Sequence, residues 1–168
     1  MRATPTDVAE SPAATVRLVP MTEAIYDAWI DRAVREYADG HVAAGNWTAE
    51  ESFERAKAQF DELLPDGPRS SGQDLWSIED DTGCPVGILW VGPRPNVSGS
   101  LWIYDIEIEP EARGRGHGRA ALDALHAWAR ERGWKRVGLH VFGSNDVARR
   151  LYERSGYVTT DVLMERAL

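Results

Sequence analysis

Three glycines alternate with basic side chains in one short stretch of this sequence. In order, the stretch is Arg113, Gly114, Arg115, Gly116, His117, Gly118 and Arg119. Glycine allows a backbone to approach a ligand closely, and a helix that starts here would add free amides and the positive end of its dipole. The whole chain has a net charge of -8, so a basic loop indicates one discrete anion rather than a general polyanion. We predict that the loop binds phosphate.

Two common phosphate-binding motifs fit this loop poorly. A P-loop requires Lys followed by Ser or Thr after its last glycine, whereas Arg119 and Ala120 stand there. The glycines and Ala121 match part of a dinucleotide-binding fingerprint. That fingerprint also needs an acidic residue at the end of the next strand, and residues 135–142 contain none. Both motifs are therefore disfavoured.

The elements on either side of the loop must position it. Apolar and polar side chains alternate before the loop, which predicts a half-buried strand that ends at Pro110. We expect one face of this strand to carry Trp102, Tyr104, Ile106 and Ile108, and the other to carry Asp105, Glu107 and Glu109. A helix rich in Ala and Leu follows, with Leu122, Leu125 and Trp128 on its apolar face and His126 in solvent on the other.

A second block of residues matches a known family together with this loop. The pattern Arg113-x-x-Gly116-x-Gly118 resembles the acyl-coenzyme A signature of the GNAT superfamily of N-acyltransferases. The pattern Asn145-x-x-Ala148-x-x-Leu151-Tyr152-Glu153-x-x-Gly156-Tyr157 resembles the last helix and the following strand of that superfamily. The resemblance implies an N-acetyltransferase that uses acetyl-CoA as its acyl donor and needs no metal.

The resemblance also implies which residues contact the coenzyme. Its pyrophosphate would lie on loop amides at Arg113, Gly114, Arg115, Gly116, His117, Gly118 and Arg119. The pantetheine arm would pair with backbone groups of Ile106 and Ile108 on the preceding strand. Asn145 would contact this arm or an ordered water, although its place at a helix start is equally typical of an N-cap.

Amine acyl transfer requires a neutral amine, donors for the oxyanion and a proton for the leaving thiolate. The resemblance implies Tyr152 as the general acid, because a phenol with a reference pKa near 10 keeps its proton at neutral pH. The alternative for Tyr152 is a core tyrosine that only packs its ring. We expect Glu107 to act as the general base, with His140 or water as alternatives. Glu107 could instead pair with a nearby arginine.

The acceptor site in this superfamily usually lies at the first two helices and their connection. The corresponding residues here are Tyr37, Asp39 and Trp47, with Asp105 opposite them. An aromatic and acidic lining suits a small cationic amine, although the connection could be an inert packed turn. A protein N-terminus or lysine is the alternative acceptor, and a coenzyme A-binding module without turnover is the alternative from outside the enzymes.

Composition limits the remaining possibilities. With 168 residues and 43% hydrophobic content, we expect one domain over residues 15–168 after a disordered tail over residues 1–14. The acidic charge argues against nucleic acid as a partner, and no apolar run is long enough for a membrane span. The single Cys84 excludes an internal disulfide and favours a reducing, cytoplasmic location. The four histidines lack the spacing of a metal site.

The order of the predicted elements gives the fold class. We expect a strand at 15–19 and then a helix from Thr22 that ends or kinks at Asp39 and Gly40. A second helix begins at a capping box of Thr48 and Glu51. Strands 75–80 and 86–91 then form a hairpin. A strand at 135–142, a helix from Asn145 and a last strand at 158–168 follow the loop helix. This order predicts a mixed α/β, GNAT-like fold: a mostly antiparallel, splayed sheet of six to seven strands with helices on both faces. A single last strand leaves a sheet edge open, so we expect a homodimer that covers it.

Overall fold

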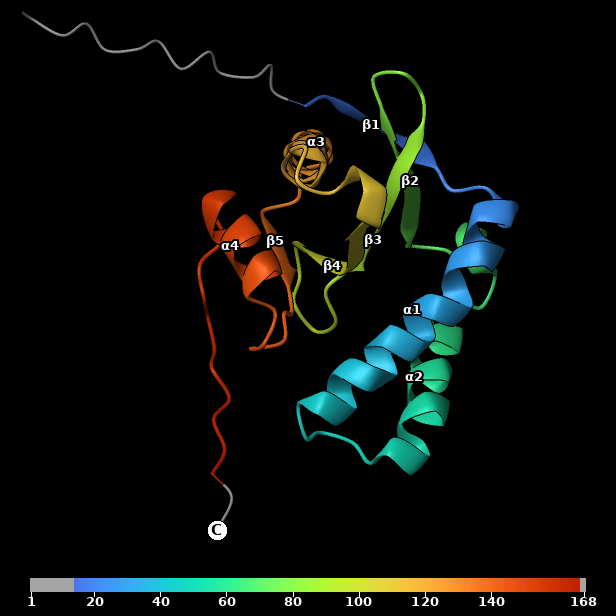
Figure 1. Ribbon diagram of the computed structural model, residues 1–168. Coiled ribbons are helices and arrows are strands. Elements are labelled where there is room, and N and C mark those ends of the chain that lie inside the picture. The colour runs from blue at the N-terminus through green and yellow to red at the C-terminus, as the bar shows by residue number, and fades with distance from the viewer. Residues whose placement is uncertain (1–13, 167–168) are drawn as a thin grey trace, which may run out of the picture.

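The computed structural model describes residues 14–166, so residues 1–13 of the predicted tail and residues 167–168 lie outside it (Figure 1). The strands are β1 (Val16–Pro20), β2 (Asp74–Asp80), β3 (Pro85–Pro93), β4 (Ser100–Ile108) and β5 (Arg136–Leu139). The helices are α1 (Glu23–Ala43), α2 (Ala49–Leu63), α3 (His117–Glu131) and α4 (Asp146–Arg154), with short 3-10 helices at Gly67–Arg69 and Pro110–Ala112. None of these helices is long and apolar enough to cross a membrane.

The strands form one sheet in the order β1-β2-β3-β4-β5. Neighbouring strands are antiparallel except for β4 and β5, which are parallel. The predicted fold class is confirmed, although the sheet has five strands rather than six to seven. The predicted last strand is wrong for residues 158–166, which form neither helix nor strand. They leave α4 and run away from the sheet (Figure 1), so their backbone meets no strand with which to pair.

Helices cover both faces of the sheet (Figure 1). α1 and α2 pack on one face, where Trp29 and Phe60 meet Trp90 of β3. α3 packs on the other face, where Leu125 and Leu89 of β3 belong to one apolar core, and α4 extends this layer along β5. Since β3 is buried on both sides, it gives β4 a rigid neighbour.

The first two helices begin at the predicted caps. Thr22 precedes α1, and its Oγ1 accepts a hydrogen bond from the Ile25 amide at 3.3 Å. The predicted capping box of Thr48 and Glu51 opens α2, where the Thr48 amide donates to Glu51 Oε1 at 3.4 Å. Both caps satisfy amides that a helix start leaves without an intrahelical partner.

α1 continues without interruption through Asp39 and Gly40 to Ala43, so the predicted end or kink is wrong. The glycine has a packing reason instead. A Cβ atom on Gly40 would lie 2.5 Å from Cε2 of Phe142, so the Phe142 ring rests directly on the helix backbone. Gly40 is therefore the point at which α1 packs against the segment that follows β5.

A β-bulge interrupts β4 at Tyr104. Trp90 of β3 pairs with Asp105 and its neighbour Val91 pairs with Ile103, which leaves Tyr104 without a partner. The extra residue reverses the alternation of side chains along the strand. Tyr104 therefore stacks on Trp90 at a centroid distance of 4.7 Å on the α1 side, whereas Ile106 and Ile108 face the α3 core. The prediction that Trp102, Tyr104, Ile106 and Ile108 share one face is wrong for this reason.

The close approach of β3 and β4 leads to a first prediction. A Cβ atom on Gly87 would overlap the backbone carbonyl oxygen of Glu107. Because a backbone atom cannot move aside as a side chain can, we expect Gly87→Ala to destabilise the protein by roughly 1–3 kcal/mol. Denaturant unfolding should show a lower midpoint at an unchanged slope. The matched control is Gly143→Ala, whose added methyl group would meet no atom within 4 Å; equal effects of both variants would contradict the explanation.

Candidate active site

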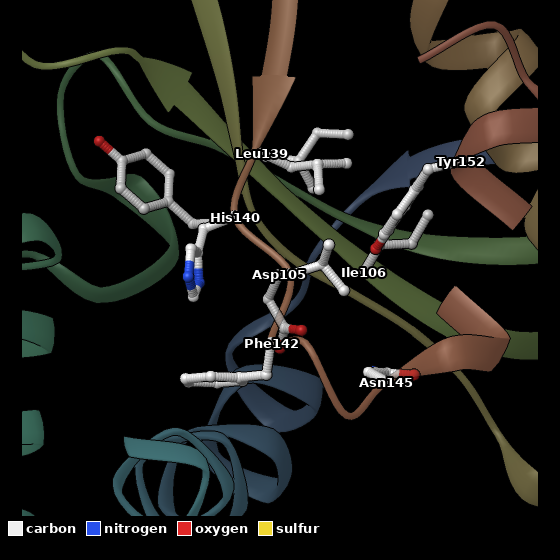
Figure 2. Close-up of a pocket in the computed structure, with 10 residues that line it drawn as sticks. Asp105, Ile106, Leu139, His140, Phe142, Asn145 and Tyr152 are labelled. Atoms are coloured by element: carbon white, nitrogen blue, oxygen red, sulfur yellow. The ribbon is translucent and has the colours of Figure 1, made fainter. Parts of the chain in front are cut away.

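β4 and β5 separate halfway along β4 and leave a cavity between them. The strands pair from Ser100 with Arg136 to Ile103 with Leu139. β5 ends there rather than at the predicted Phe142, because the bulge in β4 begins at the next residue. The cavity has a volume of about 150 Å³ and is lined by Ile103, Tyr104, Asp105, Ile106, Leu139, His140, Val141, Phe142, Asn145 and Tyr152 (Figure 2).

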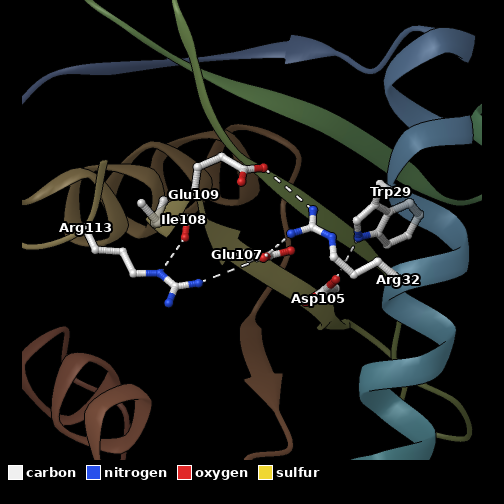
Figure 3. Close-up of polar contacts among 7 residues, drawn as sticks. All are labelled: Trp29, Arg32, Asp105, Glu107, Ile108, Glu109 and Arg113. Carbon is white, nitrogen blue, oxygen red and sulfur yellow. Dashed lines mark hydrogen bonds and ion pairs between the residues drawn. The ribbon is translucent and has the colours of Figure 1, made fainter. Parts of the chain in front are cut away.

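Asp105 enters this cavity directly after the bulge. Its Oδ2 accepts a hydrogen bond from Trp29 Nε1 of α1 at 3.0 Å (Figure 3). Burial raises the pKa of the Asp105 carboxyl to about 6, and the nearby charge of Glu107 acts in the same direction, while the Trp29 hydrogen bond opposes the rise. Asp105 is thus a partly desolvated carboxylate whose pKa lies close to neutrality.

Tyr152 approaches the cavity from α4, and its hydroxyl points inward (Figure 2). Burial, and then the charge of Asp105, raise the pKa of this phenol to about 12. The ring packs edge to face on Tyr157 at 5.7 Å. His126 Nε2 lies 2.8 Å from the Tyr157 hydroxyl, so the prediction that His126 faces solvent is wrong: it is half-buried and anchors the residue behind Tyr152.

Asn145 both caps α4 and lines the cavity. Its Oδ1 accepts a hydrogen bond from the Ala148 amide at 3.1 Å, while the residue forms part of the cavity wall. The two interpretations of Asn145 from the sequence, a cap and a contact to the pantetheine arm, are therefore compatible in space.

Glu107 lies outside the cavity lining and is held by arginines (Figure 3). Arg32 of α1 donates to Glu107 Oε1 at 2.7 Å and also lies 3.6 Å from Glu109. Arg113 lies 3.9 Å from the same Glu107 oxygen. Burial raises the pKa of the Glu107 carboxyl, and the Arg32 guanidinium counteracts that rise. The arginine pairing weighed as the alternative for Glu107 is present.

The glycine loop joins β4 to the start of α3. Gly114 and Gly116 have φ values of 73° and 86°, a region that favours glycine. Gly116 is the N-cap of α3 and contributes no side-chain hydrogen bond, so the first amides of α3 remain available to an anion. A Cβ atom on Gly118 would lie 3.2 Å from Leu151 Cδ2, and α3 and α4 therefore meet closely beside the loop.

The basic side chains of the loop have different partners. Arg113 Nε donates to the Ile108 carbonyl at 2.8 Å, and His117 Nδ1 lies 3.1 Å from the Ala112 carbonyl. Arg115 is exposed, and Arg119 lies 4.0 Å from Asp123. Among the predicted phosphate contacts, Arg113 and His117 thus bind backbone carbonyls next to the loop. Arg115 and Arg119 present their charge to solvent.

The predicted acceptor residues fall into two groups. Tyr37 and Trp47 belong to an aromatic cluster in which His41 stacks on Trp47 at 3.9 Å and meets Phe142 of the cavity wall edge to face at 5.2 Å. The guanidinium of Arg55 lies over the same Trp47 ring at 5.0 Å, so Trp47 is already engaged by two neighbouring side chains. Asp39 is exposed on α1 and does not line the cavity.

Trp29 and Arg32 are the site residues that the sequence analysis missed. No motif in the sequence distinguishes them, yet from α1 they hydrogen-bond to Asp105 and Glu107 of β4. Leu139 and Phe142 also line the cavity. The sequence predicts a continuous strand through both residues, whereas β5 ends at Leu139. Within residues 14–166, the structure contains no cluster of three His, Cys, Asp or Glu side chains that could hold a metal ion.

Comparison with known proteins agrees with this architecture. Residues 23–157 match the model of the acetyltransferase (GNAT) family. The uncharacterized N-acetyltransferase YycN of Bacillus subtilis (strain 168) is 35% identical over 155 residues, which are 92% of this chain and 99% of that protein. YdgE of the same organism, also described as an N-acetyltransferase, is 34% identical over 152 residues, or 90% and 97% of the two chains.

Solved structures show the same fold. The crystal structure of YycN from Bacillus subtilis has a TM-score of 0.85 at 35% identity and covers 92% of this chain and 99% of its own. Spermidine N-acetyltransferase from Vibrio cholerae, in complex with CoA and spermine, has a TM-score of 0.64 at 16% identity, with 92% and 87% of the chains covered. This chain therefore belongs to the GNAT family of acetyltransferases and is an acyltransferase, as its two sequence motifs indicated.

Proposed function

We propose that this protein transfers an acetyl group from acetyl-CoA to a small, cationic primary amine by direct attack in a ternary complex. The observation that carries the proposal is that Asp105 and Tyr152, two groups suited to moving protons, line one cavity at the fork of β4 and β5. Binding both substrates in one cleft lowers the entropic part of the barrier, so no covalent enzyme intermediate is needed.

The glycine loop fits the phosphates of the coenzyme. The start of α3 has no side-chain cap, Gly114 and Gly116 have positive φ angles, and Arg115 is exposed beside them. Beyond its last pair with β5, β4 continues through Ile106, which lines the open fork and whose backbone could there meet an extended arm. The Ile108 carbonyl already accepts a hydrogen bond from Arg113. Asn145 lies across the same cavity. These features support the loop, the strand and Asn145 as the coenzyme site.

Asp105 is the general base in our proposal. When a neutral amine attacks the thioester carbonyl, its nitrogen becomes positive and must lose a proton. A carboxylate with a pKa of about 6, inside the cavity and held by Trp29, is charged at neutral pH and can accept that proton. Glu107, the base predicted from the sequence, would first have to give up its 2.7 Å contact with Arg32.

Tyr152 is the proposed general acid. As the nitrogen–carbon bond forms and the carbon–sulfur bond breaks, the phenol gives its proton to the departing sulfur, and the proton on Asp105 then returns to the phenolate through solvent. The charge of Asp105 is one cause of the high pKa of Tyr152. Once Asp105 has accepted the amine proton, this charge is gone and the pKa of Tyr152 falls. The base thereby makes the acid stronger at the moment it is needed.

The acceptor would approach from the α1 side, where Asp105 offers negative charge and the cluster of Tyr37, His41 and Trp47 adjoins Phe142. Charge attraction to Asp105 supports a cationic amine. We also propose that the enzyme is cytoplasmic, since its only cysteine is the free and exposed Cys84, and that it acts as a homodimer in which a second copy covers β5.

Removal of the Tyr152 hydroxyl tests the acid. We expect Tyr152→Phe to lower kcat by roughly 100- to 10,000-fold, the usual contribution of a general acid, while the affinity for acetyl-CoA stays nearly unchanged. Steady-state kinetics with a panel of amines and calorimetric titration would measure the two quantities. Tyr26→Phe is the matched control, because Tyr26 is another partly buried tyrosine that does not line the cavity. Normal turnover of Tyr152→Phe would remove the assignment.

The pH profile distinguishes the two carboxylates. Because the pKa of Asp105 is raised to about 6, kcat/KM should rise with pH through that value as the base loses its proton. We expect Asp105→Asn to abolish this rise and to lower kcat/KM at pH 7, and Glu107→Gln to keep it. The reverse result would return the role of base to Glu107.

Calorimetry tests the donor directly. We expect acetyl-CoA and desulfo-CoA to bind with one site per chain and NAD not to bind, because the loop lacks the acidic residue of a dinucleotide site. Binding of coenzyme without turnover of any small amine would favour a protein amine as the acceptor or a module without catalysis.

A further inference from the structure

A second cavity lies between α1 and the sheet, apart from the catalytic one. It is a groove of about 280 Å³ with mainly apolar walls, among them Ile25, Trp29, Pro85 and Ile88. No residue that lines this groove also lines the catalytic cavity. Its volume exceeds the roughly 150 Å³ of an apolar protein cavity that binds benzene, so the groove has room for a molecule that contains a ring.

The groove exists because the residues on both of its sides are small. Ala24 and Ala28 are four positions apart on α1 and therefore lie on one side of that helix. Ser77 of β2 and Gly87 of β3 line the groove from the sheet. A Cβ atom on Gly87 would overlap the Glu107 carbonyl oxygen, so the close approach of β3 and β4 keeps this part of the space free of a side chain.

Ser77 brings a polar atom to these apolar walls. It pairs with Ile88 in the sheet, so both residues lie on the α1 side. Ser77 is only 2% exposed, and its Oγ has no hydrogen-bond partner among residues 14–166. A buried hydroxyl without a partner costs free energy, and a polar group on a bound molecule would provide that partner.

Arg32 and Glu109 supply the charged part of the lining and pair with each other. Arg32 Nη2 lies 3.6 Å from Glu109 Oε1, and Arg32 Nη1 donates to Glu107 Oε1 at 2.7 Å. A charged ligand would have to compete with one of these ion pairs, whereas an uncharged ligand leaves both in place. The lining therefore favours a neutral molecule.

We propose that this groove is a second ligand site, which binds a small uncharged molecule with an apolar body and one hydrogen-bonding group. The body packs against Ile25, Ile88 and the ring of Trp29, and the polar group pairs with the Ser77 hydroxyl. Burial of the apolar body drives binding, and the single polar contact fixes the orientation of the ligand.

Trp29 connects this groove to the catalytic cavity. It lines the groove, and its Nε1 donates to Asp105 Oδ2 at 3.0 Å (Figure 3). A ligand that packs on the indole therefore touches the side chain that holds Asp105. Binding at the groove needs no turnover, so this site and acetyl transfer can fail separately.

Titration of the full chain with benzyl alcohol, a ring that carries one hydroxyl, tests the site by NMR. We expect the Trp29 indole N–H signal to shift until the site is saturated. Ala28→Leu should weaken binding by about tenfold or more, because the larger side chain takes the space of the ring. Ala58→Leu is the matched control, since Ala58 is an exposed alanine of α2 that does not line the groove. Absence of a saturable shift, or equal binding by the two variants, would overturn the proposal.

Ser77→Ala tests the chemical class of the ligand. It should weaken benzyl alcohol by roughly two- to tenfold, the usual value of one hydrogen bond, and leave the binding of toluene unchanged. Benzoate, a charged molecule of similar shape, should bind the unmodified protein more weakly than benzyl alcohol. Equal losses for the two neutral probes in Ser77→Ala, or tighter binding of benzoate, would contradict the assignment.

Discussion

The bulge at Tyr104 is the constraint on which the active site depends. Regular alternation would place Asp105 on the same side as Ile103, against the largely apolar core under α3, where burial of a carboxylate is costly. Because Tyr104 has no partner on β3, Asp105 turns toward α1 and meets the indole of Trp29. The same extra residue coincides with the end of β5. One local irregularity thus aims the carboxylate and opens the cavity that receives it.

Asp105 and Glu107 are two residues apart, yet their electrostatic surroundings differ. Asp105 is held by a neutral donor and lies in the cavity, so burial dominates its pKa. Glu107 is held by Arg32, which joins α1 to the end of β4 and reaches Glu109 as well. Two carboxylates of one strand thus meet different environments, since Glu107 has a cationic partner and Asp105 has a neutral one.

The sequence predicted the features that depend on neighbouring residues. The glycine loop, the start of α3, the capping box of α2 and the approach of Tyr152 to the cavity could all be recognised from short motifs. The sequence could not reveal the bulge, because one unpaired residue leaves no trace in an alternating pattern. Nor could it identify Trp29 and Arg32, whose partners lie on another element. Gly40 was misjudged because its neighbour, Phe142, is distant in the sequence.

The contact between Gly40 and Phe142 makes one wall of the cavity depend on shape alone. The Phe142 ring is held by packing: it contacts the backbone of α1 at Gly40 and meets the rings of His41 and His140 edge to face. The position of this cavity wall is therefore set by the missing methyl group of Gly40 on α1. A side chain at position 40 would displace the Phe142 ring and so reshape the cavity, although neither Asp105 nor Tyr152 would be changed.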